Sequence, residues 1–166
     1  QCLAFITFGA LADYGRNRKF GLMLCTGVGS LSCMLFLLVS DPHMHSFAAW
    51  LTISSNVCFG LSVVYYNAFL PILVSFHPEV TSTSNSMDKI EEVENFMSTV
   101  GFMFGYIAGF IGAVFGVVLQ ALVGNEDNGR LGDRVTIFFA GLWWAGWSVW
   151  TFYCLGAHPG KPTPKL

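Results

Sequence analysis

The chain has 166 residues, of which 54% are hydrophobic and 11% are charged, whereas a soluble globular domain carries about 25% charged residues. Its mean hydropathy of +0.58 argues against a soluble domain and favours helices that lie in lipid. The formal net charge of -2 excludes a strongly basic surface, so no nucleic-acid partner is predicted.

The first apolar segment covers residues 1–12 and ends before Asp13. About twelve residues are too few for the roughly twenty that a membrane-spanning helix needs. We therefore expect this segment to be a truncated span and the chain to be a fragment cut inside a helix.

A basic turn joins this segment to the next one, and residues 9–19 read Gly-Ala-Leu-Ala-Asp-Tyr-Gly-Arg-Asn-Arg-Lys. The pattern resembles the loop between the second and third membrane helices of the major facilitator superfamily. This resemblance implies a conformational latch between two halves of a carrier, in which Asp13 accepts bonds from a neighbouring helix or an Arg. The latch residues would be Gly9, Asp13, Gly15, Arg16, Arg18 and Lys19. The alternative is a turn whose positive charges only set the topology.

Four longer apolar segments are predicted to be membrane helices, at approximately 20–40, 47–74, 97–123 and 135–155. Together with the truncated first segment they make five helices. No segment alternates between polar and apolar residues as the strands of a membrane barrel do, so an all-α, polytopic membrane fold is predicted. The superfamily resemblance implies that residues 1–166 are part of one N-terminal helical bundle.

Polar segments connect these helices. Residues 77–95 are polar and acidic and are expected to form an exposed loop. Within it, Ile90, Val93 and Met97 recur at helical spacing, which allows a short interfacial helix in its second half. The proline-rich residues 159–164 cannot sustain a helix, so the chain is expected to leave the membrane there.

The distribution of Lys and Arg predicts the orientation. If the connections alternate between the two sides, one side receives Arg16, Arg18, Lys19, Lys89, Lys161 and Lys165, and the other receives Arg130 and Arg134. Because positively charged loops stay in the cytoplasm, we expect the turn from Arg16 to Lys19 and the loop over 77–95 to be cytoplasmic.

Four polar or aromatic residues are candidates for contact with a substrate. Asn56 and Asn67 lie on one stripe of the helix over 47–74, and an unpaired amide that faces lipid is costly, so both are expected to face inward. They would bind substrate or form hydrogen bonds between helices. Tyr106 is a polar exception on the helix over 97–123, and Trp143 belongs to an aromatic cluster near the middle of the last helix. Trp143 would shape an apolar pocket or pack between helices.

A row of small residues runs along the helix over 97–123. Its glycines are spaced so that another helix can approach closely, which predicts a packing or sliding surface. They are Gly101, Gly105, Gly109, Gly112 and Gly116.

No metal, cofactor or catalytic site is predicted. His43 and His45 have the spacing of metal ligands but lack a third ligand nearby. The sequence contains no nucleophile elbow, phosphate-binding loop or zinc-protease motif, so the chain is not expected to be an enzyme. The five cysteines all lie in apolar segments, where small buried side chains are expected.

Several stretches together resemble the autophagy-related protein 22 family of fungal vacuolar amino-acid effluxers, a branch of the major facilitator superfamily. They are residues 8–15 and 55–60, Asn-Ala-Phe-Leu-Pro at 67–71, residues 105–109, Arg-Val at 134–135, and Gly-Leu-Trp-Trp at 141–144. The helix over 47–74 lacks the Arg that many superfamily members carry in their fourth helix, so proton coupling through that residue is not predicted.

The resemblance implies a carrier in the vacuole membrane that exports leucine and other neutral amino acids to the cytosol after autophagic breakdown, by alternating access. Its partners would be the lipid bilayer, the amino acids and a missing C-terminal helical bundle of the same chain. Two alternatives remain: a membrane scaffold that transports nothing, and a major facilitator carrier of another small solute.

Overall fold

The computed structural model describes residues 17–82, 87–123 and 131–155. Within these ranges the chain is helical and contains no strand, and four helices are long and apolar enough to cross a membrane. The predicted all-α, polytopic membrane fold is thus confirmed for the described part of the chain. The truncated segment over 1–12 lies outside the described residues, as do Gly9, Asp13, Gly15 and Arg16 of the expected latch.

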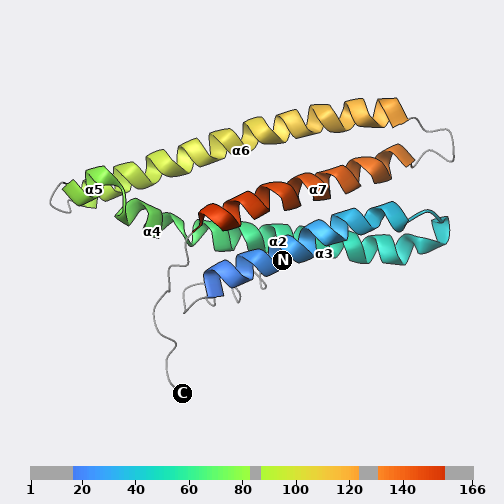
Figure 1. Cartoon of the computed structure of the whole chain (residues 1–166), viewed down its shortest axis with the longest axis horizontal. Coiled ribbons are helices and arrows are strands. Elements are labelled where there is room, and N and C mark those ends of the chain that lie inside the picture. The colour runs from blue at the N-terminus through green and yellow to red at the C-terminus, as the bar shows by residue number, and fades with distance from the viewer. Residues whose placement is uncertain (1–16, 83–86, 124–130, 156–166) are drawn as a thin grey trace, which may run out of the picture.

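Helices α2 (Asn17–Leu35) and α3 (His45–Asn67) form an antiparallel hairpin (Figure 1). Two 3-10 turns join them, η1 (Phe36–Leu38) and η2 (Pro42–Met44). The Asp41 carboxylate begins η2 by accepting a hydrogen bond of 2.9 Å from the His43 backbone N–H. This short polar connection lets α3 turn back directly along α2.

The interface between α2 and α3 is apolar, and its hydroxyl groups are paired within their own helix or, for Ser32 and Ser54, with each other across the interface at 3.1 Å. Its core cluster is made of Leu22, Cys25, Leu61, Tyr65 and Phe69. The buried hydroxyls along α2 donate to backbone carbonyls one turn earlier in the same helix, as Ser32 does to Val28 at 2.8 Å. Polar groups are therefore satisfied without water, as the interior of a membrane protein requires.

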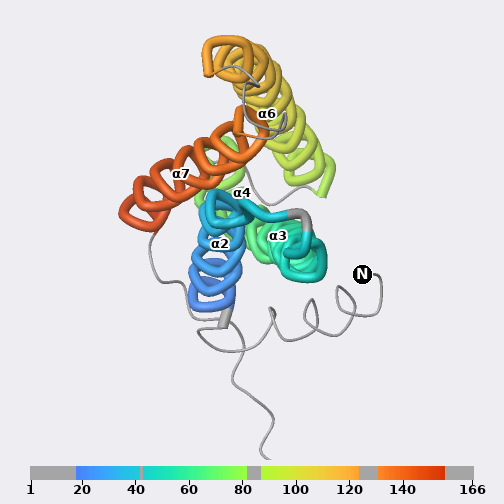
Figure 2. Tube along the Cα trace, turned by 90° about the vertical axis from the view of Figure 1, so that its right-hand side faces the viewer, coloured from blue at the N-terminus to red at the C-terminus, as the bar shows by residue number. Residues whose placement is uncertain are grey.

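Helix α7 (Leu131–Cys154) packs against α2, and helix α6 (Met87–Val123) packs against α7. Viewed along the helices, α2 lies between α3 and α7, with α6 on the far side of α7 (Figure 2). Gln120 joins the paired ends of α6 and α7 by donating to the Asp133 carboxylate at 2.5 Å. Helix α6 is thus the edge of the described bundle.

The helix expected over 47–74 is divided in the structure. Helix α3 ends at Asn67, and α4 (Leu70–Ser75) begins after a two-residue break, with Pro71 in its first turn. Proline has no backbone N–H and clashes with the preceding turn, so it belongs at the start of a new helix. The Phe69 side chain lies at the break and is 1% exposed, which holds the break against the core cluster.

The stretch over 77–95 is more helical than the expected loop, and its second half is helical as the spacing of Ile90, Val93 and Met97 allowed. Helix α5 (Pro78–Ser82) occupies its beginning, and α6 starts at Met87 instead of 97 and has 37 residues. At 1.5 Å per residue α6 is about 55 Å long, which exceeds the roughly 30 Å of the hydrocarbon core. Its first turns and α5 extend past the neighbouring ends of α2 and α7 (Figure 1).

An apolar contact explains why these first turns are helical. Val74 of α4, Val80 of α5 and Val93 of α6 are buried against one another, and we call them the elbow cluster. Leu70, Ile90 and Met97 pack around them. The acidic side chains of this stretch lie on the other faces of α6, so the helix buries its apolar stripe in the elbow cluster.

Candidate functional site

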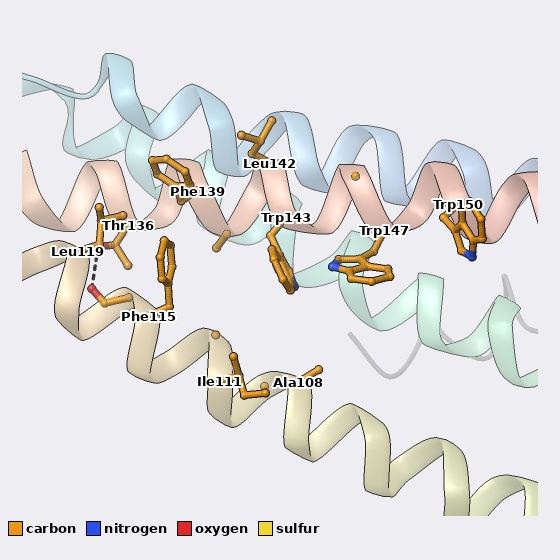
Figure 3. Close-up of a pocket in the computed structure, with 15 residues that line it drawn as sticks. Ala108, Ile111, Phe115, Leu119, Thr136, Phe139, Leu142, Trp143, Trp147 and Trp150 are labelled. Atoms are coloured by element: carbon orange, nitrogen blue, oxygen red, sulfur yellow. Dashed lines mark hydrogen bonds between the residues drawn. The ribbon is translucent and has the colours of Figure 1, made fainter.

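A cavity of about 840 Å³ lies between α6 and α7 (Figure 3). On α6 the lining combines small residues, Gly109, Gly112 and Gly116 among them, with large apolar ones such as Phe115. On α7 it is dominated by large aromatic residues. The glycines of α6 leave room opposite the aromatic side chains of α7, and both sides of the cavity are apolar.

Three tryptophans of α7 define the aromatic side. Trp143, Trp147 and Trp150 follow one another at helical spacing and line the cavity. The rings of Trp143 and Trp147 pack edge to face, with centroids 5.7 Å apart. Nearer the paired ends of α6 and α7, Phe115 and Phe139 line the cavity and make a similar contact, with centroids 6.1 Å apart.

The lining carries little polarity. None of the described residues that line it is charged, and Thr136 supplies its hydroxyl group. That hydroxyl donates to the Gly116 backbone carbonyl across the two helices at 3.4 Å (Figure 3). The cavity can thus accept an apolar group, whereas the charged ends of an amino acid would need partners from other parts of the protein.

The cavity includes only one of the four predicted substrate contacts, Trp143. Asn56, Asn67 and Tyr106 do not line it, and all three are exposed in the described bundle. Our expectation that both amides face inward is not met among the described helices. Asn56 donates to the Thr52 carbonyl of its own helix at 2.9 Å, so its N–H is satisfied without a neighbouring helix. A role in substrate binding stays a prediction for these residues.

The glycine row of α6 has few contacts with the described helices. At Gly101, Gly105, Gly109 and Gly112, no atom lies within 4 Å of the place where a Cβ would be, and at Gly116 the Thr136 methyl lies 3.1 Å away. Three members of the row, Gly109, Gly112 and Gly116, line the cavity instead. The predicted role in helix packing stays a prediction.

Close helix packing occurs at other glycines, which the sequence reading missed. Gly21 faces the Tyr65 ring, and a Cβ at Gly29 would lie 2.5 Å from the Trp144 ring. A Cβ at Gly141 would lie 2.8 Å from the Ser30 carbonyl oxygen, nearer than real Cβ atoms come. Gly21, Cys25 and Gly29 follow the same four-residue spacing of small residues that drew attention to α6, and this signal could have found them.

Two of the predicted latch residues, Arg18 and Lys19, lie in the first turn of α2. The Lys19 ammonium donates a hydrogen bond of 2.6 Å to the backbone carbonyl of Leu155, one residue past the end of α7. In the described bundle Lys19 thus contacts a helix of its own bundle.

Comparisons with known proteins give a consistent result. The sequence model of a family described as "Vacuole effluxer Atg22 like" matches residues 1–166. Autophagy-related protein 22-1 of Aspergillus niger is 29% identical, over 99% of this chain and 34% of its own length. Autophagy-related protein 22 of Chaetomium globosum is 29% identical, over 99% of this chain and 32% of its own length. Autophagy-related protein 22 of Coccidioides immitis is 28% identical, over 99% of this chain and 33% of its own length. The chain therefore spans about a third of the length of these curated relatives. No solved structure matches it.

Proposed function

The chain belongs to the Atg22-like family of vacuole effluxers, and on that basis we propose that it forms part of a multi-pass carrier in the vacuole membrane. The carrier exports leucine and other neutral amino acids to the cytosol after autophagic breakdown. It is a transporter and not an enzyme. The chain matches about a third of the length of each relative, and we infer that the transporting unit includes polypeptide beyond these residues.

The cavity between α6 and α7 is the observation that carries this proposal. Its apolar walls suit the side chain of leucine or a similar amino acid, and its volume of about 840 Å³ leaves room for more than one such side chain. Burial of such a side chain contributes about 1.5–3 kcal/mol. Because no charged residue lines the described cavity, the amino and carboxylate groups need partners outside it. Asn56, Asn67 and Tyr106 are separate candidates in this chain, because the two asparagines lie about 16 Å apart along α3.

Transport proceeds by alternating access, in which two helical bundles rock about a site near the middle of the membrane. The second bundle comes from the remainder of the polypeptide. The turn from Asp13 to Lys19 acts as the latch that favours one state.

We place the turn that contains Arg18 and Lys19 in the cytoplasm. Arg18, Lys19 and Lys89 lie at the same end of the described bundle, where α2 and α6 begin, and Arg134 lies at the opposite end, where α7 begins (Figure 1). This asymmetry follows the rule that positive charges stay in the cytoplasm.

An efflux assay with a panel of amino acids tests the proposal. Vacuolar vesicles that carry the full-length protein are loaded with labelled leucine, alanine, aspartate or lysine, and loss of label is compared with vesicles that lack it. We expect faster loss of leucine than of the two charged amino acids. Equal loss from both kinds of vesicle for the whole panel would contradict transport of amino acids.

The second candidate function is a membrane scaffold that transports nothing. It is favoured by the open glycine row of α6, where Gly101 and Gly105 have no neighbour within 4 Å of a Cβ, since such a row suits association with another helix. A carrier of another small solute is the third candidate. No flux of any solute would favour the scaffold, and flux of a different solute would favour the third candidate.

A further inference from the structure

The start of α2 and the end of α7 are joined by one partly buried hydrogen bond. The Lys19 ammonium donates to the Leu155 carbonyl at 2.6 Å, and the two residues are 136 positions apart in the sequence. Leu155 stays in line with the helix, because its own N–H bonds the Thr151 carbonyl at 2.8 Å. The carbonyl that accepts from Lys19 therefore directly continues the last turn of α7.

The Lys19 ammonium interacts favourably with the end of α7 and unfavourably with the start of its own helix, α2. The last carbonyls of a helix have no partner within it and carry partial negative charge, so a cation there satisfies one of them. A cation in the first turn of a helix, where Lys19 lies, interacts unfavourably with the dipole of that helix. The favourable contact is the one with α7.

Apolar packing supports the same junction. Leu155 and Phe152 pack against the core cluster that includes Leu22 and Tyr65. The end of α7 is thus held to α2 by side-chain packing and by a hydrogen bond from a charged group, which is stronger than a neutral one.

We propose that Lys19 clamps the end of α7 to α2. The clamp keeps the end of α7 packed on α2 and sets the point at which the chain leaves α7. In this role Lys19 acts between two helices of one bundle.

The backbone amide of Leu155 offers a natural reporter of this clamp, since its N–H is bonded to the Thr151 carbonyl and exchanges with solvent only when the end of α7 opens. In the full-length protein in membranes, hydrogen exchange at Leu155 is measured by mass spectrometry of peptides. Maleimide labelling of the buried Cys25 in the same preparations reports whether the bundle remains folded.

Lys19→Met removes the donor and keeps most of the side-chain length. We expect hydrogen exchange at Leu155 to become about tenfold faster, the change in an opening equilibrium that corresponds to the loss of one hydrogen bond to a charged group. Lys19→Arg keeps a charged donor and should exchange like the natural protein. Lys89→Met is the matched control, because Lys89 is exposed on α6 and should leave exchange at Leu155 unchanged.

The proposal is overturned if Leu155 exchanges at the natural rate in Lys19→Met, or if Lys89→Met accelerates its exchange equally. Should Cys25 also become reactive in Lys19→Met, the variant has unfolded, and Lys19→Gln is then compared with the natural protein. Its neutral amide is a weaker donor than an ammonium, so exchange at Leu155 should be faster than in the natural protein while Cys25 stays protected. A natural rate at Leu155 in Lys19→Gln would then refute the clamp.

Discussion

At the scale of single residues, the contacts of small side chains decide how the helices approach. Gly21, Gly29 and Gly141 each lie where a Cβ would meet another helix, whereas four of the glycines of α6 have open space in the described bundle. On α2 and on α6 alike, small residues recur at the four-residue spacing that is typical of a helix-packing surface. The sequence shows that small residues recur, but only the fold determines which row faces a neighbour.

Gly141→Ala should destabilise the protein by about 1–3 kcal/mol, the usual cost of overpacking. The added methyl would lie 2.8 Å from the Ser30 carbonyl oxygen, which belongs to the backbone and cannot move aside easily. We expect a lower midpoint of thermal unfolding for the full-length protein in detergent. Gly146→Ala in the same helix is the control, because no atom lies within 4 Å of its Cβ position. Equal midpoints for the two variants would contradict the observed packing of α7 on α2.

At the scale of helices, the sequence predicts the membrane spans well and their ends less well. The four described spans could be recognised because each is a long apolar run bounded by polar residues. The break before Pro71 was less evident, because the apolar run continues on both sides of it. The early start of α6 depends on the elbow cluster, which joins three helices and leaves only a weak periodic signal in any one of them.

Val93→Asp tests whether the elbow cluster stabilises the first turns of α6. Val93 is 4% exposed, so a carboxylate there would be buried without a partner in the elbow cluster. We expect faster hydrogen exchange of the backbone amides over 87–95 in the full-length protein. Met87→Asp, at a position that is 79% exposed in the same helix, should leave exchange nearly unchanged. Natural exchange rates in Val93→Asp would show that these turns are stable without the cluster.

At the scale of the whole molecule, the described chain combines a well-packed unit with an open one. Helices α2, α3 and α7 enclose the core cluster, whereas the span of α6 has no buried residue within its most apolar part. The cavity lies at the boundary between the two units. The sequence identified its glycines and Trp143 separately, but it could not show that they face each other across one cavity, since that depends on how α6 and α7 pack.

Our central claim is that the cavity between α6 and α7 receives the substrate of a carrier. Gly109→Leu fills it from α6, and Gly105→Leu adds the same side chain to the same helix outside the cavity lining. Both positions have open space around a new Cβ, so both variants should fold.

The deciding measurement is the initial rate of leucine efflux from vacuolar vesicles that carry equal amounts of the natural protein or either variant. We expect Gly109→Leu to lower the rate by about tenfold or more, because its side chain occupies the place of the substrate, and Gly105→Leu to transport nearly as the natural protein does. Equal rates for Gly109→Leu and the natural protein would contradict the claim.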